Sequence, residues 1–172
     1  MVHHVTPHDP AWAEAFATEA AALHAALPDV ALTLYHIGST AIPGILAKPI
    51  IDLMGVVPEL AQIDRHDDAM QALGYEVMGA FGIDGRRYYR KFDANGQRSH
   101  HLHVFATGAP DITRHLAFRD YLRAHDDVAT EYSALKAQLT AADTDWERYV
   151  EGKDPFIKRV EQDALRWYQA RR

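Results

Sequence analysis

The fold is decided by residues 31–57, which read ALTLYHIGSTAIPGILAKPIIDLMGVV. Residues 31–37 are mostly apolar, with aromatic and β-branched side chains, and they predict a strand that ends at Gly38. Residues 48–57 predict a second strand, which after its first lysine is apolar except for one carboxylate, Asp52. The stretch therefore predicts two strands joined by a polar turn that contains glycine.

Outside this stretch, the spacing of apolar residues and the positions of glycine and proline predict the other elements. Asp9 caps the first helix with Pro10 in its first position, and Asn95-Gly96 is typical of a hairpin turn. Helices are predicted over 10–27, 59–73, 112–125, 127–141 and from 154 onward, and further strands over 75–78, 86–92 and 100–106. This order predicts an α/β (α+β) fold with a mixed sheet of about five strands, helices packed mainly on one face and a helical C-terminal part.

The composition is that of an ordinary globular chain. Its 172 residues are 48% hydrophobic and 24% charged, which predicts one domain over residues 1–172. Lysine and arginine number 18 against 24 aspartates and glutamates, a net charge of −6, which argues against non-specific nucleic-acid binding. The chain has no cysteine, no apolar run near the roughly 20 residues that span a bilayer, and no signal-peptide pattern. We expect a cytoplasmic protein that does not bind membranes.

Gly38, Ser39 and Thr40 form the first candidate site. A glycine after a strand lets the backbone turn tightly, so that N–H groups and hydroxyls face outward and can hold a phosphate group. The same residues are also typical of a plain turn in which Ser39 or Thr40 caps a short helix. The turn by itself predicts either a phosphate site or a structural turn.

Asp52 is the second candidate, because a carboxylate in a buried strand is costly unless it meets a cation or hydrogen-bond donors. It belongs either to a functional site or to an ion pair that only stabilises the fold. Lys48 precedes it on the same face of the predicted strand. This lysine either orients an anion or is a solvated strand end.

His101 and His103 are alternate residues of one predicted strand, so their side chains share a face. Two imidazoles spaced in this way can hold one cation or one phosphate when a third ligand completes the set. The alternative is that each makes an ordinary hydrogen bond in a half-buried sheet. Arg90 belongs to a run of basic residues around the hairpin, which predicts either a phosphate clamp or a solvated strand face.

Five blocks in this order resemble the GrpB family, also called UPF0157. They are HIGSTAIPG (36–44), AKPIID (47–52), HHLHV (100–104), HLAFRDYLR (115–123) and YxxxKxxFI (149–157). The resemblance implies the fold of the nucleotidyltransferase superfamily. In that superfamily a Gly-Ser pair after the first strand and acidic residues on the next strand hold Mg²⁺ and a nucleoside triphosphate.

By this resemblance, Gly38 and Ser39 would bind the phosphate of a nucleotide or another phosphorylated small molecule, and we expect Thr40, Lys48 and Arg90 to bind it with them. The catalytic residues would be Asp52, His101 and His103. Met54 stands where a second metal-binding carboxylate is expected. Because histidine prefers softer cations than Mg²⁺, we expect this departure to replace the two-carboxylate site with a single divalent ion, Mg²⁺, Mn²⁺ or Zn²⁺, held by Asp52 with His101 or His103 and joined by His36.

Three functions remain open at this point. An enzyme with this site would transfer a nucleotidyl group to a small acceptor, with a histidine as metal ligand or base. The alternative is a non-catalytic regulatory or ligand-binding module, related to the domains fused behind dephospho-coenzyme A kinases. The third is a structural or storage metal site formed by the histidines without a nucleotide.

Overall fold

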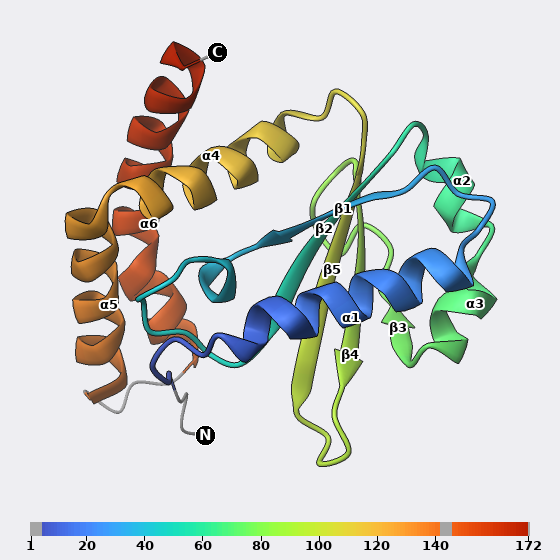
Figure 1. Ribbon diagram of the computed structural model, residues 1–172, viewed down its shortest axis with the longest axis horizontal. Helices are drawn as coiled ribbons and strands as arrows, with labels where there is room; N and C mark the ends of the chain where they lie inside the picture. Colours follow the sequence, from blue (N-terminus) through green and yellow to red (C-terminus); the bar gives the residue numbers. More distant parts are fainter. Residues whose placement is uncertain (1–4, 142–145, 172) are drawn as a thin grey trace.

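The computed structural model describes residues 5–141 and 146–171 (Figure 1). Its helices are α1 (Ala11–Ala26), α2 (Leu60–Asp64), α3 (Asp67–Ala72), α4 (Pro110–Ala124), α5 (Asp126–Ala141) and α6 (Trp146–Ala170). Its strands are β1 (Thr33–Ile37), β2 (Ile51–Val57), β3 (Tyr75–Val77), β4 (Arg86–Phe92) and β5 (Arg98–Ala106). A short 3-10 helix, η1 (Ser39–Ala41), follows β1.

The strands form one mixed sheet in the order β1-β2-β5-β4-β3, which confirms the predicted fold class. β2 and β5 are parallel neighbours, and the other pairs are antiparallel. A parallel pair needs a long crossover connection, which α2, α3, β3 and β4 supply here. The parallel register sets Asp52 beside His101 and Met54 beside His103.

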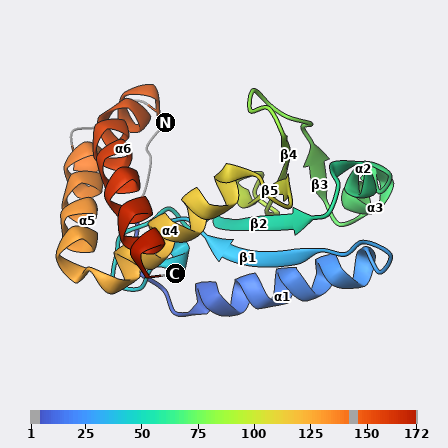
Figure 2. The same cartoon turned by 90° about the horizontal axis from the view of Figure 1, so that it is seen from above.

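One face of the sheet is covered by α1, α2 and α3. Leu53 and Leu102 from the central strands are fully buried there and belong to one apolar cluster with Leu23 of α1, Ile63 of α2 and Met70 of α3. Figure 2 shows α1 running along this side of the sheet, with α5 and α6 on the other side. Because side chains alternate along a strand, the neighbours of the buried leucines in β2 and β5 point away from α1.

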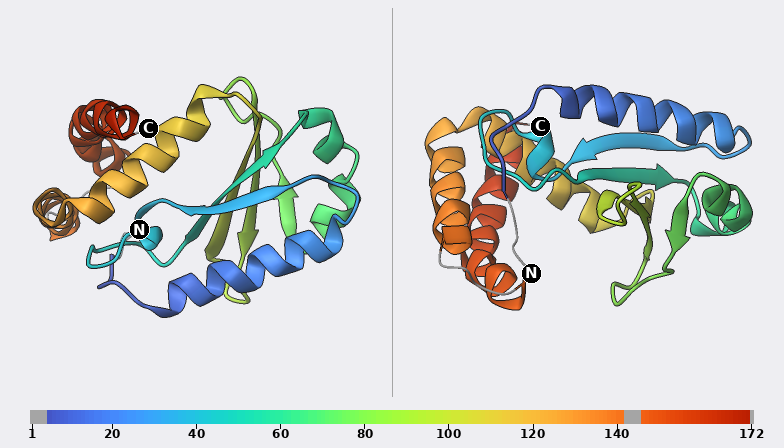
Figure 3. Two further views of the ribbon diagram at one scale, coloured as in Figure 1. Left: turned by 45° about the horizontal axis from the view of Figure 1, so that its top comes forward. Right: turned by 90° about the horizontal axis from the view of Figure 1, so that it is seen from below.

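The second face is covered only in part, by α4. Ile37, Met54 and Phe105 form a small apolar cluster there, against Ile112 and Leu116 of α4. Beyond the exit of β1, α4, α5 and α6 pack together around Ile42, Tyr132 and Phe156 (Figure 3). Within the described ranges, no helix combines the length and the apolar character that crossing a membrane requires.

Two helix boundaries differ from the prediction. The last helix begins at Trp146, so that Pro155 lies inside it and not at its start. Packing overrides the proline signal, because Tyr149 is buried and a Cβ atom on Gly152 would come within 2.6 Å of the Leu139 side chain. The predicted helix 59–73 is divided into α2 and α3. The break lies at His66, whose backbone leaves the helical region and whose ring Nδ1 lies 3.0 Å from the Gln62 carbonyl oxygen.

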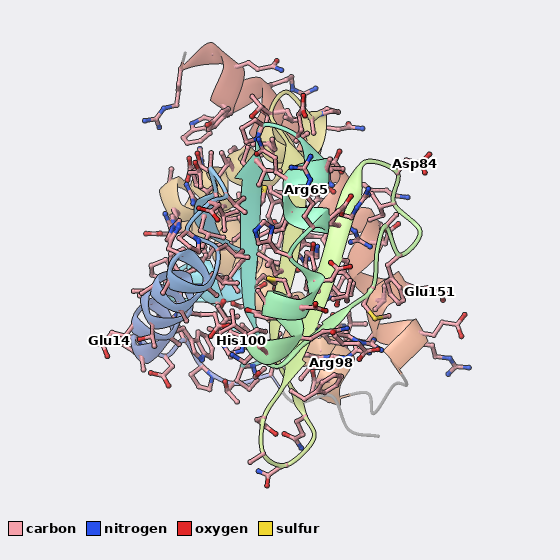
Figure 4. All side chains as sticks on the ribbon, turned by 90° about the vertical axis from the view of Figure 1, so that its right-hand side faces the viewer. Glu14, Arg65, Asp84, Arg98, His100 and Glu151 are labelled. Carbon is pink, nitrogen blue, oxygen red and sulfur yellow. The ribbon has the colours of Figure 1, made fainter. Side chains whose placement is uncertain are left out.

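A buried carboxylate ties α1 to the sheet. Glu19 of α1 accepts a hydrogen bond from the Tyr75 hydroxyl at 2.5 Å and is approached by the Lys91 ammonium at 3.1 Å. The His100 ring lies 3.8 Å from the same carboxylate. Figure 4 shows His100 and Glu14 of α1 on the same side of the sheet. Glu19 therefore links α1 to three strands, β3, β4 and β5.

Replacement of Glu19 should be more costly than replacement of one of its partners. Glu19→Ala leaves the Lys91 ammonium without its carboxylate, and we expect a loss of about 2–4 kcal/mol in the free energy of unfolding. Tyr75→Phe removes only one hydrogen bond and should cost about 1 kcal/mol. Urea denaturation at neutral pH measures both. If the two losses are equal, the carboxylate does not hold α1 in place.

Candidate functional site

Asp52 stands on the face of the sheet that α1 leaves open. Its Oδ1 atom lies 3.4 Å from Nδ1 of His101 and 3.6 Å from Nε2 of His103, and the side chain is 28% exposed. Burial raises the pKa of Asp52, but the two imidazoles lower it by more, so that it lies well below its usual range. Asp52 is therefore an ionised carboxylate between two histidines.

The predicted turn packs directly against this carboxylate. Gly38 has a φ of 74°, and a Cβ atom there would come within 2.6 Å of the Asp52 Oδ2 atom. Only glycine accommodates both the left-handed backbone and the close approach. Ser39 follows at the start of η1, and its hydroxyl accepts a hydrogen bond from the Lys136 ammonium. Gly38 thus lies against Asp52, and Ser39 follows it beside Lys136.

Lys136 of α5 is a site residue that the sequence analysis did not identify. Its side chain is buried at 2% exposure and also donates to the Leu46 carbonyl at 3.0 Å. Burial, with repulsion from Lys153 and Lys48, lowers the pKa of Lys136 to about 7, although the charge of Asp52 acts in the opposite direction. Nothing in the sequence marks it, because a lysine in an amphipathic helix usually faces solvent.

Lys48 and Lys153 complete a group of three cations, called here the lysine cluster: Lys48, Lys136 and Lys153. The ammonium group of Lys48 lies 4.8 Å from the centroid of the Tyr149 ring, and that of Lys153 lies 4.5 Å from it. Burial lowers the pKa of Lys48 to about 8 and also lowers that of Lys153, which the Asp52 carboxylate partly offsets. The loop before β2, α5 and α6 each contribute one member, so only the tertiary structure forms the cluster.

Arg86 of β4 determines the proton position on His103. Its Nη1 group lies 3.3 Å from Nδ1 of His103. Because a guanidinium only donates, His103 accepts at Nδ1, and the proton of the neutral ring lies on Nε2, which faces Asp52. His115 of α4 lies beside this ring, with 6.0 Å between centroids, and burial lowers its pKa to about 4.

Three predicted residues do not join this group. His36 points to the opposite face, where it stacks on Phe16 of α1 at 5.0 Å and contacts the buried Thr40 hydroxyl at 2.8 Å. The reason is strand alternation: Ile37, not His36, pairs with Asp52. This corrects the expectation that His36 shares a metal site with Asp52 and that Thr40 faces a phosphate. Arg90 lies on the site face, but its guanidinium is paired with Glu76 through two bonds of 3.1 Å.

The side chains do not fit the magnesium site of two carboxylates that the resemblance implies. In residues 5–141 and 146–171, no group of three or more histidines and carboxylates is arranged to hold a metal ion. Met54 is fully buried in the apolar cluster under α4, at the place of the second carboxylate. Both imidazoles face the same Asp52 oxygen, and Arg86 adds a positive charge behind His103.

The candidate site is not the recess between α4 and α6. That recess has a volume of about 470 Å³ and is lined by Asp120, Arg123, Ala124, Trp167, Tyr168 and Arg171. The Asp52 group instead lies on the open face of the sheet.

Comparisons with known sequences give one consistent result. The family described as GrpB protein matches residues 3–163. The UPF0157 protein YqkA of Bacillus subtilis is 44% identical over 161 residues, which are 93% of this chain and 46% of YqkA. The chain thus spans about half the length of that relative. A dephospho-CoA kinase of Mycolicibacterium paratuberculosis is 28% identical over 187 residues, covering 95% of this chain and 46% of the kinase.

Solved structures show the same relationships. Conserved protein GrpB from Enterococcus faecalis is 43% identical with a TM-score of 0.90, covering 96% of this chain and 99% of that one. The Cid1 poly(U) polymerase with Mg 3′-dATP bound is 14% identical with a TM-score of 0.55, covering 78% of this chain and 44% of that one. The second likeness shows the fold alone: this chain shares the arrangement of its helices and strands with the poly(U) polymerase.

The contact between Gly38 and Asp52 predicts a difference between two glycine variants. Gly38→Ala places a Cβ atom against the carboxylate, whereas Gly44→Ala has a similar φ of 83° and no atom within 4 Å of its Cβ. We expect Gly38→Ala to lower the free energy of unfolding by about 1–3 kcal/mol more than Gly44→Ala, measured by urea denaturation. Equal losses would show that the turn does not pack against Asp52.

The pKa of Lys136 predicts how stability depends on pH. Between pH 7 and 10 the unfolded chain holds the Lys136 proton more tightly than the folded chain, so the free energy of unfolding should rise with pH. Lys136→Met removes this contribution and should flatten the rise by about 1.4 kcal/mol per pH unit. Denaturation of both proteins at several pH values tests this, since Lys48 and Lys153 are unchanged in the variant. Parallel slopes would contradict a lowered Lys136 pKa.

Proposed function

Because this chain belongs to the GrpB family, whose fold resembles that of a nucleotide-polymerising enzyme, we propose that it binds the phosphate groups of a nucleotide or another phosphorylated small molecule. The observation that carries this proposal is the lysine cluster beside the Gly38-Ser39 turn. Three partly or fully buried ammonium groups lose hydration and repel one another, which costs free energy. A phosphate anion between them offsets this cost.

The Asp52 carboxylate sets where the phosphate lies. Its negative charge repels an anion, so the phosphate belongs on the side of the lysine cluster and the Ser39 hydroxyl. His101 and His103 contact the Asp52 carboxylate from β5, on the side away from the proposed phosphate. A nucleotide is the first ligand class to test, because the related Cid1 structures are described with MgGTP and a UTP analog. We also propose the cytoplasm as the location, since it supplies such ligands.

A divalent ion is not required for this mode of binding. The cations that face the phosphate come from the chain itself, and Met54 takes the place of the second carboxylate. The competing proposal, a single ion held by Asp52 with His101 or His103, makes phosphate binding depend on metal. Titration with and without Mg²⁺, Mn²⁺ and Zn²⁺ separates the two.

The second candidate function is catalysis, in which the bound nucleotide reacts. A nucleotidyl transferase would use Asp52, His101 and His103 as its catalytic residues, whereas a regulatory or ligand-binding module would bind without reaction. Met54 favours the module, because its apolar side chain removes a metal ligand. The likeness to about half of a dephospho-CoA kinase supports the same candidate. Release of pyrophosphate from ATP, GTP, CTP or UTP would favour the transferase.

Replacement of Lys153 should weaken phosphate binding. We expect Lys153→Met to bind inorganic triphosphate at least 10-fold more weakly than the wild type, as measured by isothermal titration calorimetry. Lys158→Met is the matched control, because Lys158 lies on the same helix, is 72% exposed and pairs with Asp154. Equal affinities of the two variants, or no binding of triphosphate by the wild type, would overturn the proposal.

A further inference from the structure

An exposed aromatic ring lies on the loop between β3 and β4. Phe81 is 54% exposed, and its ring stacks on that of Tyr88 of β4, with 5.3 Å between centroids and 25° between planes. Its φ of 47° is uncommon for a residue other than glycine and unfavourable for a bulky side chain. The chain therefore keeps a large apolar ring in water in a costly backbone conformation.

Arg86 holds this loop and the candidate site together. The guanidinium donates to the carbonyl oxygen of Phe81 at 3.0 Å and to that of Ala80 at 3.3 Å. The same group contacts His103, which faces Asp52. Arg86 is buried at 7% exposure, so these contacts are shielded from water. The position of the Phe81 ring is thereby coupled to that of the site histidine.

Aromatic contacts place Phe81 across Asp52 from the lysine cluster. The Tyr88 ring lies 5.7 Å from that of His101 and 5.3 Å from that of His103. Across the sheet, the order is the exit of β1 with Ser39, then Asp52 on β2, the histidines on β5 and Tyr88 on β4. Figure 4 shows Asp84 of the same loop, with Glu151 of α6, on the side of the sheet away from Glu14 of α1.

We propose that Phe81 is the stacking surface of a ring-binding subsite, which takes the heteroaromatic ring of a nucleoside-type molecule next to Tyr88, on the far side of the site histidines from Asp52. An exposed aromatic ring stacks planar bases with little dependence on their identity. Phe81 meets this need because the Tyr88 ring stacks on it, the Arg90 guanidinium lies 5.8 Å from its centroid and Arg86 fixes its backbone. The choice of a nucleoside rests on the proposed function, because phosphate binding at the lysine cluster makes nucleotides the fitting ligand class.

A tryptophan reporter tests the subsite directly. Phe81→Trp keeps a ring on Tyr88 and adds a fluorophore that a stacked base quenches. Adenosine and uridine should quench this signal in a saturable manner, and inorganic triphosphate should not. Ile83→Trp is the matched control, because Ile83 lies on the same loop and is 39% exposed. Equal quenching in the two variants, or no saturable quenching by either nucleoside, would overturn the subsite.

Affinity measurements supply a second readout that does not depend on the reporter. Phe81→Ala should bind adenosine roughly 5- to 100-fold more weakly than the wild type, whereas Phe81→Tyr should bind it about as well. Both variants should bind inorganic triphosphate like the wild type, which also shows that they are folded. Unchanged adenosine affinity in Phe81→Ala contradicts the subsite alone. If the wild type does not bind inorganic triphosphate, the proposed function is contradicted instead.

Discussion

The negative charge of Asp52 is the constraint on which this site depends. A carboxylate in the second strand of an apolar sheet must be compensated, and the fold supplies two imidazoles from β5 and the ammonium groups of Lys136 of α5 and Lys153 of α6. The turn that follows β1 has glycine at the point of contact because no side chain fits beside the carboxylate. The register of β2 and β5, the glycine turn after β1 and the packing of α5 and α6 thus all place residues around Asp52.

Glu19 and Asp52 are carboxylates on opposite faces of the sheet, and their surroundings differ. Glu19 is nearly inaccessible, and its oxygens are satisfied by the Tyr75 hydroxyl and the Lys91 ammonium. The Asp52 side chain is 28% exposed. It lies near two imidazoles and the ammonium groups of Lys136 and Lys153, so the basic groups around it outnumber its single negative charge. An excess of cations beside an accessible surface is the arrangement expected for binding an anion.

Met54 lies where the family resemblance leads us to expect a second metal-binding carboxylate. The methionine packs with Ile37 and Phe105 under α4, so the position of the missing carboxylate has become part of the apolar core. His103, its neighbour on β5, is held by Arg86 as a donor toward Asp52. The positive charges near Asp52 come from lysine, arginine and histidine side chains, which suits the direct binding of phosphate that we propose.

The sequence by itself determined the sheet, most of its helices and the placement of Gly38, His101 and His103 around Asp52. Local signals were sufficient for these: alternation along β5 places His101 and His103 on one face, and Gly38 marks the turn against Asp52. It did not determine the face of His36, the start of α6 or the burial of Lys136. Those depend on strand register and on packing between residues distant along the chain. Only the tertiary structure decided which lysines lose their water, because hydration depends on surroundings that no local pattern records.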